Sequence, residues 1–185
     1  MSAKKRFRPL WVTLHWLMAL LVFTTFGIGL SSLANKPISD AKIIPLAIHM
    51  TLGILILLIV IARYIMRILI YPPPHRAASA PAVTAKKVLF LDQLTSYVHP
   101  LLYLLTGLMA LLGIAIALPA NLFSTVFTRS GAPLPVSFYI YPARIWHGTL
   151  SLVLMLLIAQ HVLVAIFHQF LKGENYLGRM WFTKK

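Results

Sequence analysis

The sequence of 185 residues contains no cysteine, and this absence removes several kinds of redox site at once. Without thiols the chain can form no disulfide, no iron–sulfur cluster held by thiolates and no covalent link to haem through a C-x-x-C-H motif. Acidic residues are almost missing as well, since the sequence has 3 Asp and Glu residues against 17 Lys and Arg residues. Any electron-carrying group would therefore be held without covalent attachment through cysteine.

Charged residues of both signs are scarce. They make up 11% of the sequence, while 59% of it is hydrophobic, and a soluble domain is nearer half apolar. The charges fall between four long apolar runs, roughly residues 10–33, 46–70, 94–118 and 145–171. Each run exceeds the roughly 20 residues that a spanning helix needs, and backbone polar groups inside lipid must be satisfied within helices. We therefore expect an all-α integral membrane protein, a four-helix bundle that forms a single domain over residues 1–185.

The basic residues predict which side of the membrane each end faces. Thirteen of the 17 lie in the N-terminal segment, in the C-terminal tail, or between the second and third runs and their flanks. By the positive-inside rule, both termini are expected in the cytoplasm. Charge spread over helix ends argues against a nucleic-acid partner and favours the lipid bilayer. The first run exceeds the roughly 7 to 15 residues of a secretory signal core, and cleavage would discard His15, so we expect this helix to be retained.

Histidines at matching depths are the most informative feature that is present. His147 and His161 lie fourteen residues apart in the last run, which places them within about 40° of one helix face and about 21 Å apart along its axis. Sorted by the predicted topology, His49 and His147 share an outer level. An inner level holds His15 and His161, with His99 nearby. Ionisable side chains inside a membrane indicate a functional site by default, although a single histidine can simply hydrogen-bond between helices.

Imidazoles paired at two depths suit two haems better than one zinc ion. A structural zinc site gathers four ligands at one depth and commonly uses cysteine. Because cysteine is absent, each haem would be of the b type, held by its axial ligands and by packing. Small residues would leave space for a flat macrocycle, although ordinary close helix packing uses them too. The glycines in or near the runs are Gly27, Gly29, Gly53, Gly107, Gly113 and Gly148.

Three arginines and two more histidines are candidates for a supporting role. Arg63 and Arg67 lie four residues apart at the inner end of the second run, where they would pair with haem propionates or act as interfacial anchors that snorkel to water. Arg144, at the start of the last run, is the outer counterpart and would bind a propionate or draw in an anion. His99 and His168 would donate a proton to a quinone, because imidazole titrates near neutral pH. The alternative for both histidines is a water-facing position near a helix end.

Together these residues resemble the prokaryotic cytochrome b561 family, which comprises four-helix membrane cytochromes with two haems. The resemblance covers nearly the whole chain. It rests on His15-Trp16, His49 with Gly53, Arg63 and Arg67 before Tyr71-Pro72, His99 with Tyr103, the series His147, His161 and His168, and the tail from Lys172 to Met180. It implies two haem b groups, the inner one ligated by His15 and His161 and the outer one by His49 and His147. It also implies a multi-pass protein of the bacterial inner membrane.

One branch of this family is similar to superoxide oxidase, which passes electrons from superoxide to ubiquinone. Members of that branch often carry two adjacent histidines late in the fourth helix, but the second position here is Gln169, so the quinone site carries over less directly. Related cytochromes are electron-transfer subunits of hydrogenases or dehydrogenases. A conduit for a periplasmic redox partner, with Phe138 to Tyr141 as its docking surface, is therefore the alternative function.

We expect electron transfer between the periplasmic side and the quinone pool, with superoxide as the favoured donor. The outer connections carry Lys36, Lys42, Arg129 and Arg144 against one acid, Asp40, and such a basic mouth would concentrate a small anion. This assignment would make the protein a superoxide:quinone oxidoreductase. A metal or proton transporter that uses intramembrane histidines is a third hypothesis, and it predicts no Soret absorption.

Overall fold

The computed structural model describes residues 9–70, 90–128, 130–173, 175, 178, 180 and 181, without the side chains of residues 70 and 90–96. Within these ranges the chain is helical and has no β-strand. The four long helices are α1 (Pro9–Ile28), α2 (Ile43–Ile65), α3 (Phe90–Ala117) and α4 (Pro142–Phe170). Each is long and apolar enough to cross a membrane. The prediction of an all-α membrane bundle of four helices is confirmed.

Short helical segments extend or link the long helices. The π-helical segments η1 (Gly29–Ala34) and η3 (Met66–Ile70) continue α1 and α2, and the 3-10 turn η2 (Asp40–Lys42) leads into α2. Two further segments, η4 (Ser124–Thr128) and η5 (Phe138–Ile140), lie between α3 and α4. Helix α4 begins at Pro142, three residues before the predicted start. Proline suits this first position because its missing N–H would have no partner within the helix.

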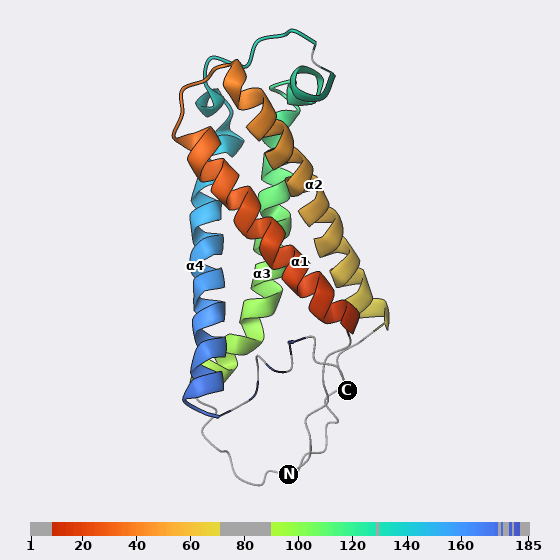
Figure 1. The fold of residues 1–185 in the computed structure, drawn as a ribbon, viewed down its shortest axis with the longest axis vertical. Helices are drawn as coiled ribbons and strands as arrows, with labels where there is room; N and C mark the ends of the chain where they lie inside the picture. Colours follow the sequence, from red (N-terminus) through yellow and green to blue (C-terminus); the bar gives the residue numbers. More distant parts are fainter. Residues whose placement is uncertain are drawn as a thin grey trace.

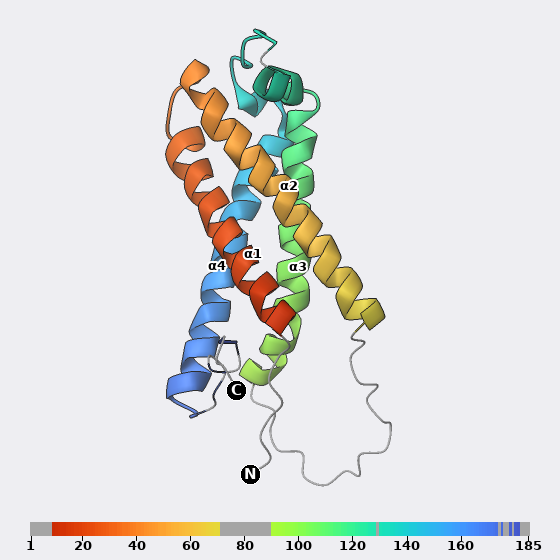
Figure 2. The ribbon, with the colours of Figure 1, turned by 45° about the vertical axis from the view of Figure 1, so that its right-hand side comes forward.

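The long helices lie side by side along the long axis of the molecule (Figures 1 and 2). Helix α1 begins, and α4 ends, at the same end of the bundle, which we call the terminal end. The opposite end carries η1, η4 and η5, and we call it the cavity end. Close backbone packing joins α1 to α2, α2 to α3 and α3 to α4. Helix α4 therefore runs the full length of the bundle and contributes side chains at both ends.

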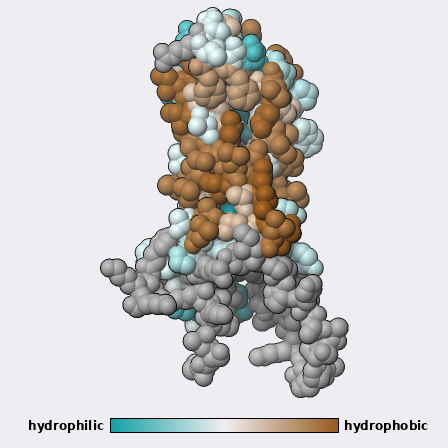
Figure 3. All heavy atoms as spheres, turned by 90° about the vertical axis from the view of Figure 1, so that its right-hand side faces the viewer, coloured by the Kyte–Doolittle hydropathy of each residue, from teal (hydrophilic) through white to brown (hydrophobic). Residues whose placement is uncertain are grey.

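The outside of the bundle is apolar, as a lipid-facing surface must be. Leu20, Leu104 and Leu156 are between 65% and 72% exposed, and Figure 3 shows a hydrophobic band over the middle of the visible face. Several polar side chains lie inside instead, namely Lys42, Arg63, Thr106, Thr125 and His168. Soluble proteins seldom bury lysine or arginine without a partner. These interior polar groups therefore mark where a functional site is to be sought.

Candidate functional site

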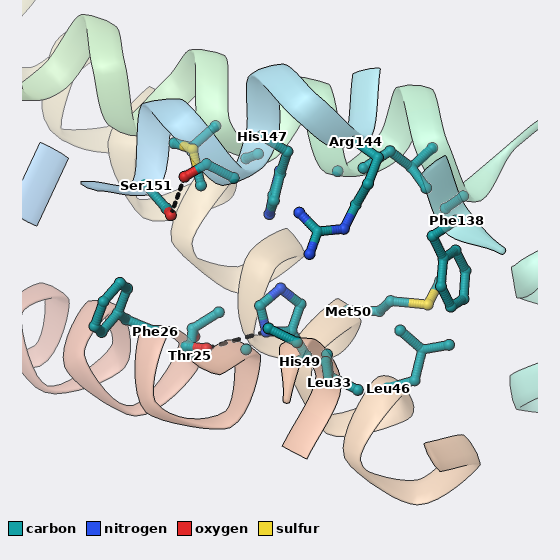
Figure 4. A pocket seen from close by; sticks show the side chains of 18 of the residues that line it. Thr25, Phe26, Leu33, Leu46, His49, Met50, Phe138, Arg144, His147 and Ser151 are labelled. Carbon is teal, nitrogen blue, oxygen red and sulfur yellow. Dashed lines mark hydrogen bonds between the residues drawn. The ribbon is translucent and has the colours of Figure 1, made fainter. Parts of the chain in front are cut away.

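His49 of α2 and His147 of α4 face each other at the cavity end, with their ring centroids 6.1 Å apart. Figure 4 shows a ring nitrogen of each imidazole pointing toward the other histidine. Imidazole nitrogens bind metals at about 2 Å, and with about 1 Å from nitrogen to ring centre, two rings that share a metal are roughly 6 Å apart. The separation of this pair fits a single metal ion between the rings.

His15 of α1 and His161 of α4 repeat this spacing at the terminal end, where their ring centroids are 6.2 Å apart. His99 of α3 lies only 5.0 Å from His161, which is about 1 Å less than a shared metal requires. His99 is also exposed. Ring spacing therefore favours His15 over His99 as the partner of His161. Within the described residues no group of three or more His, Cys, Asp or Glu side chains could hold a metal ion, so paired imidazoles are the available donor set.

A hydrogen bond orients one histidine of the cavity-end pair. Nδ1 of His49 lies 3.0 Å from the backbone oxygen of Thr25 on α1 (Figure 4). When this nitrogen carries the proton and donates it to the carbonyl, Nε2 is left as a metal ligand, as is usual for ligating histidines. Nδ1 of His147 is buried and has no hydrogen-bond partner among the residues that the structure describes, so only His49 is oriented in this way.

A cavity of about 590 Å³ surrounds the cavity-end pair and is lined by all four long helices. Cofactor pockets typically measure about 300 to 1,000 Å³. Most of its lining is apolar, and among the predicted glycines Gly29, Gly113 and Gly148 contribute to it. A Cβ atom at Gly29 would lie 3.1 Å from Cε1 of His49, and one at Gly113 would lie 3.5 Å from Cε1 of His147. The missing side chains thus make room for the two imidazoles and for a flat group between them.

Two cations line the same cavity. Arg144 extends its guanidinium beside the gap between His49 and His147 (Figure 4) and places Cζ 5.2 Å from the centre of the Tyr139 ring. Lys42 is only 5% exposed, and its Nζ donates a hydrogen bond of 2.5 Å to the carbonyl oxygen of Leu33. Among the described residues that line the cavity there is no aspartate or glutamate. The geometry and charge of this cavity suit a metal-bearing group that carries carboxylates, or a small anion that reaches it.

Arg63 of α2 is the corresponding cation at the terminal end. It is 8% exposed, and its Cζ lies 5.6 Å from the ring centre of Trp11, one turn before His15 on α1. Its Nε donates a hydrogen bond of 2.9 Å to the hydroxyl of Tyr103 on α3, while Nη1 is buried and has no partner within the described part of the chain. Arg67, four residues further along in η3, is half-buried. The two arginines predicted as a pair therefore differ, since only Arg63 is enclosed by the bundle.

His168 and the described residues of the C-terminal tail lie at the terminal end. His168 is 5% exposed and contacts Phe167 edge to face. The alternative prediction, that this histidine faces water, is therefore wrong. Contact between the tail and α1 was not predicted from the sequence. Nevertheless, the indole nitrogen of Trp16 donates a hydrogen bond of 2.8 Å to the carbonyl oxygen of Met180, and Trp181 packs edge to face on Trp16. The predicted anion-attracting residue Arg129 lies outside the described residues.

Comparison with known protein families identifies the family of this chain. The family model described as prokaryotic cytochrome b561 matches residues 6–183. No curated protein and no solved structure gives a significant match. The family implies electron transfer in a membrane by means of haem b, and the paired imidazoles beside an apolar cavity supply the donors and the space that such a group needs. The chain belongs to the prokaryotic cytochrome b561 family and is a multi-pass membrane protein of the haem b electron-transfer type.

Proposed function

We propose that the chain binds two b haems, one between His49 and His147 and one between His15 and His161. The observation that carries this proposal is the near-equal spacing of the two pairs, 6.1 Å and 6.2 Å between ring centroids. Haem supplies one-electron chemistry, and two axial histidines leave its iron no open position for oxygen. The chain would hold the imidazole rings of each pair at this spacing, exclude water from the apolar cavity and orient the imidazole nitrogens that bind iron. Helix α4 supplies one histidine to each pair and so sets the distance between the two sites.

For the direction of electron flow, we propose that the cavity end faces the periplasm of a bacterial inner membrane. Electrons would then enter near His49 and His147 and leave to ubiquinone at the terminal end. His99 and His168 are the proposed proton donors for the quinone, since both lie on the terminal side of the bundle. Two electrons and two protons convert ubiquinone to its quinol, so two single-electron donations are needed for each turnover.

Superoxide is the donor that we propose. Lys42 and Arg144 line the cavity, and its described lining contains no carboxylate. An apolar cleft with charges of one sign raises the local concentration of a small anion. Each superoxide ion would give up one electron and leave as molecular oxygen, a neutral product that the cationic lining does not retain. The protein would then act as a superoxide:quinone oxidoreductase.

Salt dependence tests this donor. We expect the rate at which superoxide reduces the haems of the purified protein to fall as ionic strength rises, because salt screens the attraction between the anion and the cavity cations. Arg144→Gln should lower the rate at low salt by roughly tenfold and flatten the salt dependence. An uncharged reductant serves as the control and should show little salt effect in either protein. A superoxide rate that ignores salt, or no reduction of the haems by superoxide, contradicts the assignment.

A second function is supported by exposed apolar residues at the cavity end. Val136, Tyr139 and Ile140 are 97%, 67% and 66% exposed. Such a surface would suit a periplasmic or membrane-bound oxidoreductase that delivers electrons directly. Val136→Ser combined with Ile140→Ser should then abolish reduction by that partner and leave the superoxide rate unchanged. If the wild-type protein purifies from its native membrane without any oxidoreductase, this second function loses its support.

A further inference from the structure

Arg63 is a buried cation whose hydrogen-bonding capacity is only partly used. Arginines that anchor a helix at a membrane interface extend their guanidinium to water, but Arg63 is only 8% exposed, and its Nη1 has no hydrogen-bond partner among the described residues. Asp40 is the one acidic residue whose side chain is described, and it lies at the cavity end. A buried charge without a counter-charge is costly. The described side chains therefore include no anion that balances the positive charge of Arg63.

Two aromatic residues from two other helices hold the guanidinium in place. Its Nε donates to Tyr103 of α3 at 2.9 Å, and its Cζ lies 5.5 Å from the centre of the Tyr103 ring. On α1, the ring centre of Trp11 lies 5.6 Å from the same carbon. Cation–π contacts within about 6 Å are attractive, especially away from water. Three helices thus fix the direction in which the unfilled Nη1 donor can act.

Arg63 lies close to the pair of His15 and His161, because its contact Trp11 is one turn before His15 on α1 and its contact Tyr103 is one turn after His99 on α3. The haem proposed for that pair carries propionate groups, and arginine is the side chain best suited to bind a carboxylate through two parallel hydrogen bonds. A positive charge that is held away from water also stabilises an added electron more strongly than a positive charge in water does. The position of Arg63, its positive charge and its unpaired Nη1 donor therefore all suit one carboxylate of the terminal-end haem.

We infer that Arg63 is a preformed binding site for a propionate of the terminal-end haem. Tyr103 and Trp11 are positioning residues, which fix the orientation of the Arg63 guanidinium and thereby raise the midpoint potential of that haem. This inference rests on the proposed two-haem function. Tyr103 acts through Arg63 and need not touch the haem. The cavity-end haem lies at the other end of α4 and should not respond to changes in this cluster.

Redox titration of the purified haem-loaded protein tests the inference. In Arg63→Gln the midpoint potential of the terminal-end haem should fall, because the charge that offsets the propionate is lost. Tyr103→Phe should lower the same potential by a smaller amount while both haems stay bound. Arg63→Lys should restore only part of the potential, because one ammonium group cannot donate to Tyr103 and also form two parallel bonds to a carboxylate. In the titration of His15→Ala, the redox transition of one haem should be missing, and this missing transition identifies the terminal-end haem.

Tyr97→Phe is the matched control, because Tyr97 lies on the same helix as Tyr103 but is 71% exposed, and it should leave both potentials unchanged. Unchanged potentials in Arg63→Gln and Tyr103→Phe would overturn the inference, as would equal shifts of both haems. If these variants raise the KM for quinone while the potentials hold, the guanidinium serves the quinone and the inference is wrong. If Arg63→Gln does not assemble, Tyr103→Phe alone decides. Wild-type protein with other than two haems refutes the proposed function instead.

Discussion

Purified His147→Ala should contain one haem where the wild-type protein contains two. Alanine removes one of the two donors at the cavity end, and a haem held through a single histidine with no covalent link should be lost during purification. The pair of His15 and His161 stays intact, because position 161 lies fourteen residues further along α4, about 21 Å away along its axis. The remaining haem should keep the absorption and the low-spin signal of an iron with two axial histidines.

The haem-to-protein ratio from a pyridine haemochrome assay measures this loss. His49→Ala should give the same ratio and the same remaining spectrum, because both variants empty the same site. His75→Ala provides the control. The sequence places this histidine between the second and third apolar runs, and the proposal assigns it to neither pair, so the variant should retain the wild-type ratio. Loss of both haems from His147→Ala, or of neither, contradicts the pairing proposed here.

The second large effect is expected from Gly29→Leu, which should eliminate the cavity-end haem without removing a ligand. A Cβ atom at this position would already lie 3.1 Å from Cε1 of His49, which is closer than ordinary van der Waals contact. The three further carbons of leucine would extend into the cavity or push the imidazole away from His147. Gly29→Ala should have a smaller effect, because the ring then has to move by only a few tenths of an ångström.

Gly27→Leu is the matched control for this variant. Gly27 lies two residues earlier on the same helix, and a Cβ atom there would have no heavy atom within 4 Å. The Gly27→Leu variant should therefore bind both haems, with the haem-to-protein ratio and the spectrum of the wild-type protein. A normal haem content in Gly29→Leu would show that the close approach of α1 to His49 does not limit the site.

The sequence was sufficient to predict four membrane helices, because lipid imposes a simple requirement on length and polarity. The spacing of His147 and His161 also predicted two levels correctly, since residues fourteen apart return to one helix face. The pairing partner at the terminal end did not follow from the residues alone. His15 and His99 were both available by depth, and only the rotation and tilt of α1 and α3 distinguish their distances to His161.

The interior cations show why the rest of the site escaped prediction. Lys42 was expected at an exposed mouth, but the structure buries it in the cavity wall with its ammonium on the Leu33 carbonyl. Arg63 and Arg67 looked alike by sequence, yet only Arg63 is enclosed. Hydropathy describes how apolar a helix is on average and does not say which way a given side chain turns. That information comes from contacts between helices far apart in the sequence.

The dependence of both histidine pairs on α4 also bears on how the molecule is made. His15 and His49 emerge from the ribosome long before His147 and His161. Under the proposed ligation, neither haem can gain its second histidine until α4, which is synthesised after the other three long helices, has been inserted beside them. Cofactor capture is consequently a late step of biogenesis, and the earlier helices must first persist in the bilayer as an empty, apo intermediate.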